Sequence, residues 1–180
     1  NSALRRDSQA SFGLARVDAL TGVGNRLRLD EDLAMIWSQA RRYGRGYSAA
    51  MCDIDWFKLY NDHLGHLAGD AALRDIAQTL RRHLRRADAI YRYGGEEFLV
   101  IFPEQTAREV VRVAERMCRA VRDLGMRTVA GDGVVTLSIG VAELTSEDES
   151  VMAWLERADA ALYRAKANGR NCVQCDPRSP

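Results

Sequence analysis

Carboxylates gather in two short segments, and each segment borders an apolar run. Asp53 and Asp55 lie at the end of one apolar run. Glu96 and Glu97 follow a pair of glycines, and this segment separates two further apolar runs. Glycines let the backbone pass close to a ligand, and two adjacent acids repel each other unless something neutralises them. Acids from two turns can hold Mg²⁺, which prefers hard oxygen ligands and often bridges carboxylates to phosphates. The plainer alternative, a solvated hairpin tip beside a polar strand end, stays open at this point.

Lysine is confined to two positions. Of 26 basic residues only Lys58 and Lys166 are lysines, and the others are arginines. An ammonium is a compact point charge on a flexible stem and suits phosphate, whereas a guanidinium is a planar fork. Lys58 lies five residues after Asp53, and Lys166 lies four before Arg170 near a predicted helix end, so both could reach one triphosphate. Two lysines left over from a bias toward arginine would explain the same pattern.

The composition indicates a globular chain of one domain. The 180 residues are 47% apolar and 28% charged, with 3 prolines and a net charge of +1. This charge argues against non-specific binding to nucleic acid or an anionic membrane. Neither a membrane span nor a signal-peptide core is present, and 4 scattered cysteines favour a reducing cytoplasm. Because the chain begins at Asn1 rather than methionine, we expect a missing upstream region, where a sensory domain or membrane anchor could lie.

Periodicity and capping residues predict the secondary structure. Helices are expected from an N-cap at Asn25 to Gly44, through residues 73–84, after a capping box at Thr106 and Glu109, and after another at Ser146 and Glu149, ending near residue 169. Strands are expected at 47–53, 89–93, 98–102, 134–142 and in a short last segment. This β-α-β-β-α-β order with added helices predicts an α+β fold around a mostly antiparallel sheet.

Several spaced motifs occur in one order along the chain. They are Asp18 to Arg26, Asp53 to Asp62, His63 to Asp70, Arg92-Tyr93 before Gly94-Gly-Glu-Glu-Phe98, Ser138 to Ala142, and Ala158 to Asn171. With them the chain resembles the GGDEF family of diguanylate cyclases over about residues 16–175. Residues 1–15 would then be the end of an incoming signalling helix, and residues 176–180 a tail. Ordered motifs are far more specific than the five-residue signature alone.

The resemblance implies a palm-like, ferredoxin-like nucleotidyltransferase that condenses two GTP into cyclic di-GMP and releases two pyrophosphates. It implies Mg²⁺ or Mn²⁺ bound by Asp53, the carbonyl of Ile54 and Glu96, with Glu97 beside them. Glu96, Glu97 and Lys58 would be the catalytic residues, and Glu96 is the best candidate to accept the ribose 3′-hydroxyl proton. Because each GTP attacks the other, two domains must meet as a transient homodimer.

The substrate contacts follow from the same resemblance. Lys58, Lys166 and Arg170 would face the phosphates. Asn61 and Asp70 match the guanine-binding pair, and an ionised Asp70 can accept both guanine donors. His66 is expected to shape the nucleotide pocket. As alternatives, Asp70 could cap the following helix and Asn61 could be an ordinary turn residue.

Arg85 and Asp88 resemble the family's inhibitory site for the product cyclic di-GMP. An arginine fork fits guanine or phosphate, and a carboxylate accepts guanine donors. The alternative is a solvated basic stretch at a helix end, where positive charge suits the helix dipole. We expect no metal role for Cys172 and Cys175 or for His63 and His66, and we expect Trp56 and Phe57 to pack under the metal loop.

Two rival functions remain. One is a catalytically silent module that senses GTP or cyclic di-GMP and regulates a partner domain. The other is a scaffold for a phosphodiesterase elsewhere in a longer protein. The intact acids and both lysines favour an active cyclase over the silent module.

Overall fold

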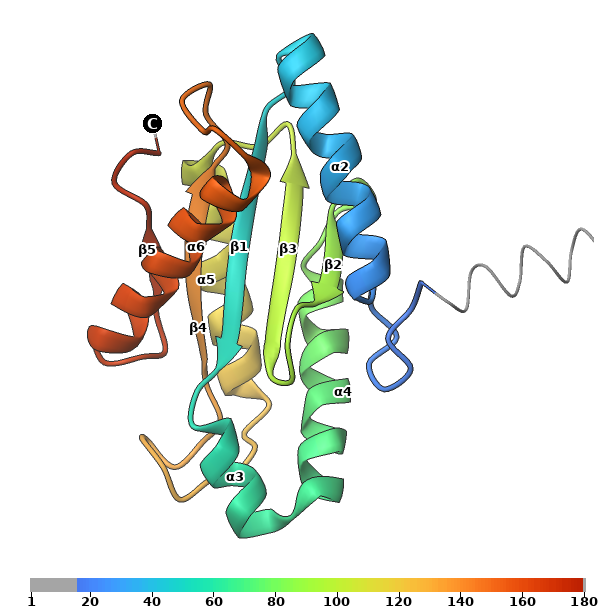
Figure 1. The fold of residues 1–180 in the computed structure, drawn as a ribbon. Helices are drawn as coiled ribbons and strands as arrows, with labels where there is room; N and C mark the ends of the chain where they lie inside the picture. Colours follow the sequence, from blue (N-terminus) through green and yellow to red (C-terminus); the bar gives the residue numbers. More distant parts are fainter. Residues whose placement is uncertain (1–15, 180) are drawn as a thin grey trace, which may run out of the picture.

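The computed structural model describes residues 16–179 (Figure 1). The elements are α2 (Arg26–Tyr43), β1 (Tyr47–Ile54), α3 (Phe57–Leu64), α4 (His66–Arg82), β2 (Ala89–Arg92), β3 (Glu97–Pro103), α5 (Ala107–Asp123), β4 (Leu137–Glu143), α6 (Val151–Ala167) and β5 (Val173–Cys175). The incoming helix predicted over residues 1–15 lies outside the described residues. Within residues 16–179 no helix is long and apolar enough to cross a membrane.

The five strands form one sheet in the order β2-β3-β1-β4-β5. Among the strand pairs of residues 16–179, β4–β5 alone is parallel. This arrangement confirms the α+β fold with a ferredoxin-like βαββαβ core, to which α2, α3 and β5 are added. Strand β1 is central, and all eight of its residues are buried. A strand covered on both faces needs a continuous apolar run rather than alternation, which explains its sequence.

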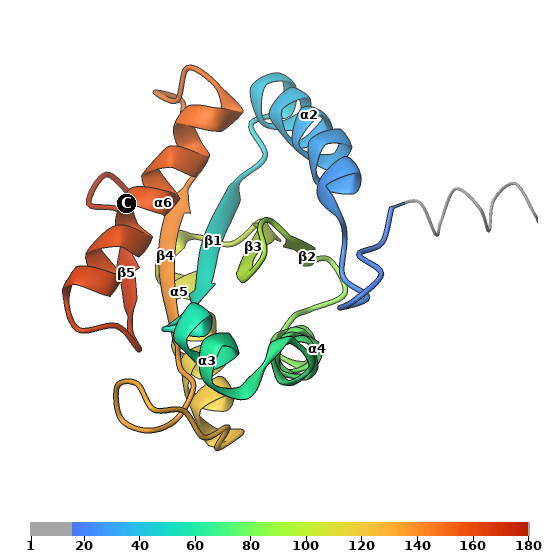
Figure 2. The same ribbon diagram turned by 60° about the horizontal axis from the view of Figure 1, so that its bottom comes forward.

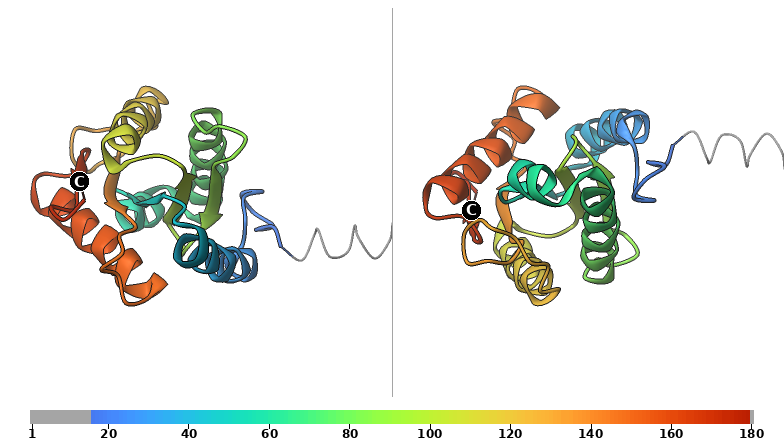
Figure 3. Two further views of the ribbon diagram at one scale, coloured as in Figure 1. Left: turned by 90° about the horizontal axis from the view of Figure 1, so that it is seen from above. Right: turned by 90° about the horizontal axis from the view of Figure 1, so that it is seen from below.

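Helices cover both faces of the sheet. Helices α4 and α5 lie on one face and α2 and α6 on the other, as the end-on views show (Figure 3). Side chains of a strand alternate between the faces. Ala50 and Cys52 of β1 therefore join the core under α4 and α5, whereas Ala49 and Met51 join the core under α2 and α6.

The helix ends test the predicted caps. Asn25 accepts a hydrogen bond from the Arg28 amide at 3.1 Å, and Thr106 and Glu109 form the predicted capping box. The capping box predicted at Ser146 and Glu149 is wrong, because Ser150 caps α6 through the Ala153 amide. Asp148 instead closes the preceding loop by accepting from Thr145.

Further elements differ from the prediction. Helix α4, predicted over residues 73–84, begins seven residues earlier, at His66, and ends at Arg82. Strand β4 begins at Leu137, three residues later than predicted, since Val134 makes only an isolated bridge to Arg127. Helix α3 precedes α4 as a separate element, which the sequence pattern did not predict. Gly65 divides the two helices at a φ of 89°, which a residue with a side chain rarely adopts.

The segments that contain the predicted metal- and phosphate-binding residues meet at one end of the sheet. The end of β1, the turn between β2 and β3, the start of α3 and the end of α6 all lie in the lower half of Figure 1, which Figure 2 brings forward. The strand register puts Asp53 opposite Glu97 of β3 and Ser138 of β4. The fold thus brings acids separated by more than 40 residues to neighbouring positions.

Candidate active site

A cavity of about 430 Å³ opens at this end of the sheet. Its lining consists of Asp53, Asp55, Trp56, Phe57, Lys58, Leu59, Asp62, Glu96, Lys166 and Arg170. Lys166 Nζ lies 3.1 Å from Asp53 Oδ1. The two acidic turns, both lysines and Arg170 therefore share one cavity, as the sequence patterns suggested separately.

The three acids of the site perturb one another. Burial raises the pKa of Asp53, and the Lys166 ammonium acts against that rise. Burial also raises the pKa values of Glu96 and Glu97, and the charge of Asp53 adds to both shifts. Repulsion among partly buried carboxylates is relieved by a bound cation, so the electrostatics suit a metal or a cationic side chain here.

The donor set fits Mg²⁺ only together with other oxygen ligands. In the described part of the chain, no three acidic, histidine or cysteine side chains alone form a metal-binding group. Mg²⁺ commonly takes one or two protein carboxylates and fills its other positions with water and substrate phosphates. Asp53 and Glu96 line the cavity and provide such a pair, and Ile54 can add its carbonyl. Glu97 does not line the cavity; its carboxylate lies over Gly94, where a Cβ would approach Glu97 Oε2 to 2.5 Å.

Asp55 has a structural task distinct from that of Asp53. Its buried carboxylate accepts from Thr136 Oγ1 and Ser138 Oγ, both at 2.7 Å, and from the Asn171 amide at 3.0 Å. It thereby joins the end of β1 to the start of β4 and to the loop after α6. These bonds anchor the loop that carries Arg170.

The turn between β2 and β3 is held from outside the hairpin. Arg92 donates to the carbonyl of Gly95 at 2.8 Å and to Asp18 at 3.1 Å. Although burial acts to raise it, hydrogen bonds from Thr21 and Arg92 lower the pKa of Asp18. Spacing in the sequence predicted no individual role for Asp18 or Arg92, although an aspartate three residues before Thr21 is a recognisable turn signal.

The predicted guanine-binding residues lie on neighbouring helices. Asn61 is in α3 rather than in a turn, and its Oδ1 is buried without a hydrogen-bond partner. Gly69 of α4 leaves room for this amide, because a Cβ there would lie 1.7 Å from Asn61 Oδ1. Asp70 is the fifth residue of α4 and therefore does not cap it. Both structural alternatives are thus wrong, and a buried unpaired amide oxygen is an unmet requirement for a donor.

The remaining predicted nucleotide contacts are more exposed. Lys58 lies on α3 and lines the cavity. His66 is the exposed first residue of α4 and is not part of the cavity lining. Its predicted part in shaping the nucleotide pocket stays a prediction.

Arg85 and Asp88 form a compact turn between α4 and β2. Asp88 accepts from the Arg85 amide at 2.7 Å and from Gln105 Nε2 at 3.0 Å. The carboxylate therefore shapes the turn, while the exposed Arg85 side chain makes no hydrogen bond or ion pair with residues 16–179. Burial raises the pKa of Asp88.

The cysteines and aromatic residues near the site have separate surroundings. The thiols of Cys172 and Cys175 donate to different backbone carbonyls, those of Ala165 and Asp176. Phe57 is buried as predicted, but Trp56 is not: the residue is 46% exposed. Arg170 lies over the Trp56 ring, an association that spacing alone could not reveal because 114 residues separate the two.

Comparison with known proteins agrees with this geometry. A family model described as "Diguanylate cyclase, GGDEF domain" matches residues 15–172. The response regulator PleD of Caulobacter vibrioides is 40% identical over 172 residues, covering 94% of this chain and 38% of PleD. The chain thus spans well under half of that relative.

Two solved structures are also similar. The coiled coil and GGDEF domain of DgcB from Caulobacter crescentus, in complex with c-di-GMP, has a TM-score of 0.89 at 33% identity and covers 97% of this chain and 92% of that one. The active GGEEF domain of a Vibrio cholerae diguanylate cyclase has a TM-score of 0.78 at 30% identity, over 86% and 98% of the two chains. With its sheet, its acidic hairpin and a family model matched over residues 15–172, the chain belongs to the GGDEF domain family of diguanylate cyclases.

Proposed function

We propose that this domain condenses two GTP molecules into cyclic di-GMP and two pyrophosphates. The observation that carries the proposal is the single cavity that brings Asp53 and Glu96 together with Lys166 and Arg170. Carboxylates beside cationic side chains match a triphosphate with a divalent ion. Asn61, with its unpaired buried oxygen, supports a guanine base at the α3–α4 side.

In the proposed mechanism each side chain has a limited task. A bound divalent ion would supply acidity to the ribose 3′-hydroxyl and neutralise charge at the α-phosphate, and Asp53, Glu96 and the Ile54 carbonyl would hold it. Glu96 would also accept the hydroxyl proton, because it lines the cavity beside Asp53, where the ribose 3′-hydroxyl must lie. Lys58, Lys166 and Arg170 hold the phosphates. Lys166 also balances the charge of Asp53, to which it is paired.

A direct assay separates this proposal from its rivals. The domain is incubated with GTP and Mg²⁺ or Mn²⁺, and cyclic di-GMP and pyrophosphate are measured together. We expect both products at a ratio of one to two. Nucleotide binding without product would instead favour the silent sensing module, and neither binding nor product would favour a scaffold. The proposal places the domain in the cytoplasm, in agreement with four free cysteines.

Base selectivity depends on Asp70 in this proposal. In Asp70→Ser we expect the preference for GTP over ATP to fall by at least about tenfold, because a hydroxyl can donate to adenine N1 whereas a carboxylate cannot. Competition between the two nucleotides measures the change. Asp75→Ser on the exposed side of α4 is the matched control. Unchanged selectivity would show that Asp70 does not contact the base.

We also propose that the productive state is a transient dimer. The product contains two equivalent phosphodiester links, and one domain presents one such cavity, so two domains must face each other about a two-fold axis. Specific activity should therefore rise with enzyme concentration below the dimerisation constant. Activity per milligram that stays flat across a hundredfold dilution, with sedimentation showing a monomer throughout, would contradict the dimer. We further propose that a sensory domain upstream of these residues would act on this step.

Product inhibition is proposed for the turn formed by Arg85 and Asp88. Arg85→Ala removes a free guanidinium but leaves the amide that Asp88 accepts from, so the turn should persist. We expect a higher final yield of cyclic di-GMP with the initial rate unchanged. Arg108→Ala, on the exposed side of α5, is the control. If the product inhibits Arg85→Ala as strongly as the parent, this turn is not the inhibitory site.

A further inference from the structure

Backbone strain is concentrated around the cavity. The described residues include four non-glycine residues with positive φ, and three of them are Trp56 at 58°, Arg170 at 65° and Asn171 at 49°. Trp56 connects β1 to α3, while Arg170 and Asn171 follow α6. Left-handed conformations of such residues persist only where surrounding contacts impose them, and they cluster at functional sites.

Two contacts join the strained segments. They connect the consecutive residues Asp55 and Trp56 with the consecutive residues Arg170 and Asn171. Asp55 accepts from the backbone amide of Asn171 at 3.0 Å. Trp56 supports the neighbouring Arg170, whose Cζ lies 3.9 Å from the centre of the indole ring. One pair of residues at the end of β1 therefore fixes the backbone and the side chain of the loop after α6.

The position of Arg170 over the ring leaves its hydrogen-bonding capacity free. A guanidinium stacked by its face keeps all its N–H donors in its own plane. Within residues 16–179 the Arg170 guanidinium makes no hydrogen bond or ion pair. Both Trp56 and Arg170 line the cavity beside Lys166. A half-exposed arginine would otherwise sample many rotamers, so the ring reduces the entropy that phosphate binding must overcome.

We propose that Trp56 is a positioning residue that holds the Arg170 guanidinium ready for the terminal phosphates of the nucleotide. The inference rests on the proposed function only in taking a guanosine triphosphate as the ligand. Trp56 acts through its π face rather than by contact with the substrate. Its contribution should therefore depend on an aromatic ring and on the presence of β- and γ-phosphates.

Two substitutions separate the π face from apolar bulk. Trp56→Leu keeps an apolar side chain, whereas Trp56→Tyr keeps an aromatic face, and both accept the same left-handed backbone strain. Two probes are used, each with Mg²⁺. One is GMP, which lacks the β- and γ-phosphates, and the other is the α,β-methylene analogue of GTP, which has them. Calorimetry measures the affinity for each. Trp56→Leu should bind the analogue about three- to tenfold more weakly, with GMP affinity nearly unchanged, and Trp56→Tyr should recover most of the loss. In turnover assays, KM for GTP should rise more than kcat falls.

Two controls make the result specific. Trp37→Leu removes a second tryptophan ring with an arginine over it, in which Arg41 Cζ lies 4.5 Å from the ring centre. This pair belongs to α2, none of whose residues lines the cavity. Trp37→Leu should leave both affinities unchanged. In the Arg170→Leu background, Trp56→Leu should cause no further loss for the analogue, because its effect passes through Arg170.

Each outcome bears on the inference. Equal weakening for the analogue and GMP would show a merely structural role, and no weakening would show that Arg170 needs no support; either overturns it. If the parent domain binds the analogue but makes no cyclic di-GMP, the proposed function is wrong, while the inference about Trp56 can still be tested by binding. A parent domain that binds neither probe overturns both.

Discussion

Replacing Glu96 by alanine is expected to abolish cyclase activity, with a loss of at least about 100-fold in kcat/KM, while the fold persists. The Glu96 side chain lines the cavity, and its contribution to the backbone is a carbonyl that accepts from the Ile54 amide at 3.3 Å. Alanine keeps that carbonyl. Production of cyclic di-GMP under saturating Mg²⁺ measures the loss, and circular dichroism and thermal unfolding test the fold.

The Glu96 variants should lose activity without losing stability. A carboxyl whose folded pKa is raised binds protons more tightly in the folded state, so ionised Glu96 costs stability at neutral pH, and this cost disappears as pH falls below its ordinary pKa. Glu96→Gln should therefore be inactive yet as stable as the parent or slightly more stable. Glu147→Ala, an exposed acid in the loop before α6, is the matched control and should keep full activity. Residual activity above a few per cent in Glu96→Ala would refute its catalytic role.

Local signals predicted most of the elements but not all their limits. The central strand, the acidic hairpin and the caps at Asn25 and Thr106 follow from apolar runs and capping residues that act within a few positions. The local pattern favours Ser146 as the cap of α6, because an acid follows it three residues on and Ala153 holds that place after Ser150, yet Ser150 is the cap. Their difference arises from Asp148, whose carboxylate is occupied by Arg157 and Thr145.

The site shows the same limit. Motif order indicated which residues matter, but the separate tasks of Asp53 and Asp55 depend on Thr136 and Ser138 of β4, more than 80 residues away. The position of Trp56 depends on a left-handed backbone that its residue type disfavours. Such non-local features become visible only when the sheet register is known.

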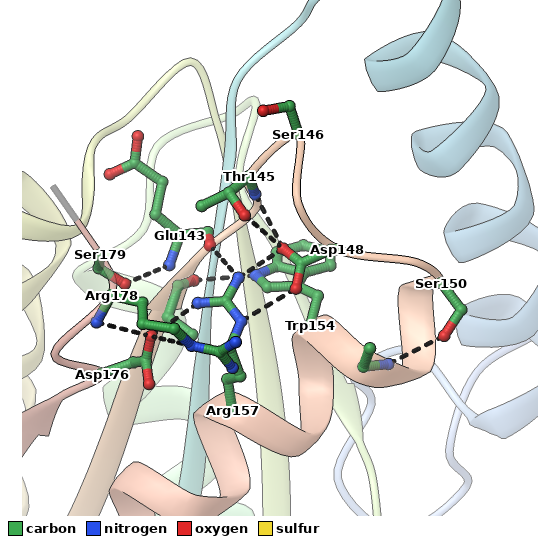
Figure 4. Close-up of polar contacts among 12 residues, drawn as sticks. Glu143, Thr145, Ser146, Asp148, Ser150, Trp154, Arg157, Asp176, Arg178 and Ser179 are labelled. Carbon is green, nitrogen blue, oxygen red and sulfur yellow. Dashed lines mark hydrogen bonds and ion pairs between the residues drawn. The ribbon is translucent and has the colours of Figure 1, made fainter.

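A buried arginine provides the clearest example of a feature hidden in the sequence. Arg157 of α6 is 5% exposed, and nothing in its sequence context distinguishes it from the 23 other arginines. Figure 4 shows its guanidinium between Asp148 and Asp176. Nε donates to Asp148 at 3.0 Å, Nη1 to Asp176 at 2.7 Å, and Nη2 to the Glu143 carbonyl at 2.6 Å. It thereby joins the end of β4, the loop before α6 and the segment after β5.

Removing this guanidinium should cost more stability than removing any of the exposed charges of the domain. Arg157→Met would leave the carboxylates of Asp148 and Asp176, 5% and 6% exposed, without their shared cation. Breaking a buried ion pair in this way costs about 3–5 kcal/mol. The midpoint of urea unfolding at pH 7 should fall accordingly. Arg164→Met, which removes one 3.3 Å hydrogen bond from the same helix, should cost about 1 kcal/mol or less.

The pH dependence distinguishes lost charge pairing from lost packing. Burial alone would raise the pKa of Asp148, but hydrogen bonds from Arg157 and from the Thr145 backbone hold it below its ordinary value of 3.8. In the parent protein Asp148 therefore stabilises the fold above that value, and the contribution is lost as pH falls through the lowered folded pKa. In Arg157→Met the hydrogen bonds and charge that lower the pKa of Asp148 most strongly oppose burial no longer, so burial raises this pKa. Protonation of Asp148 then removes a buried charge and stabilises the folded variant. The stability gap between parent and variant should thus narrow as pH falls from 7 toward 4, measured by urea unfolding at each pH. A gap that stays constant over this range would mean that Arg157 stabilises the domain by packing its stem rather than by neutralising two buried acids.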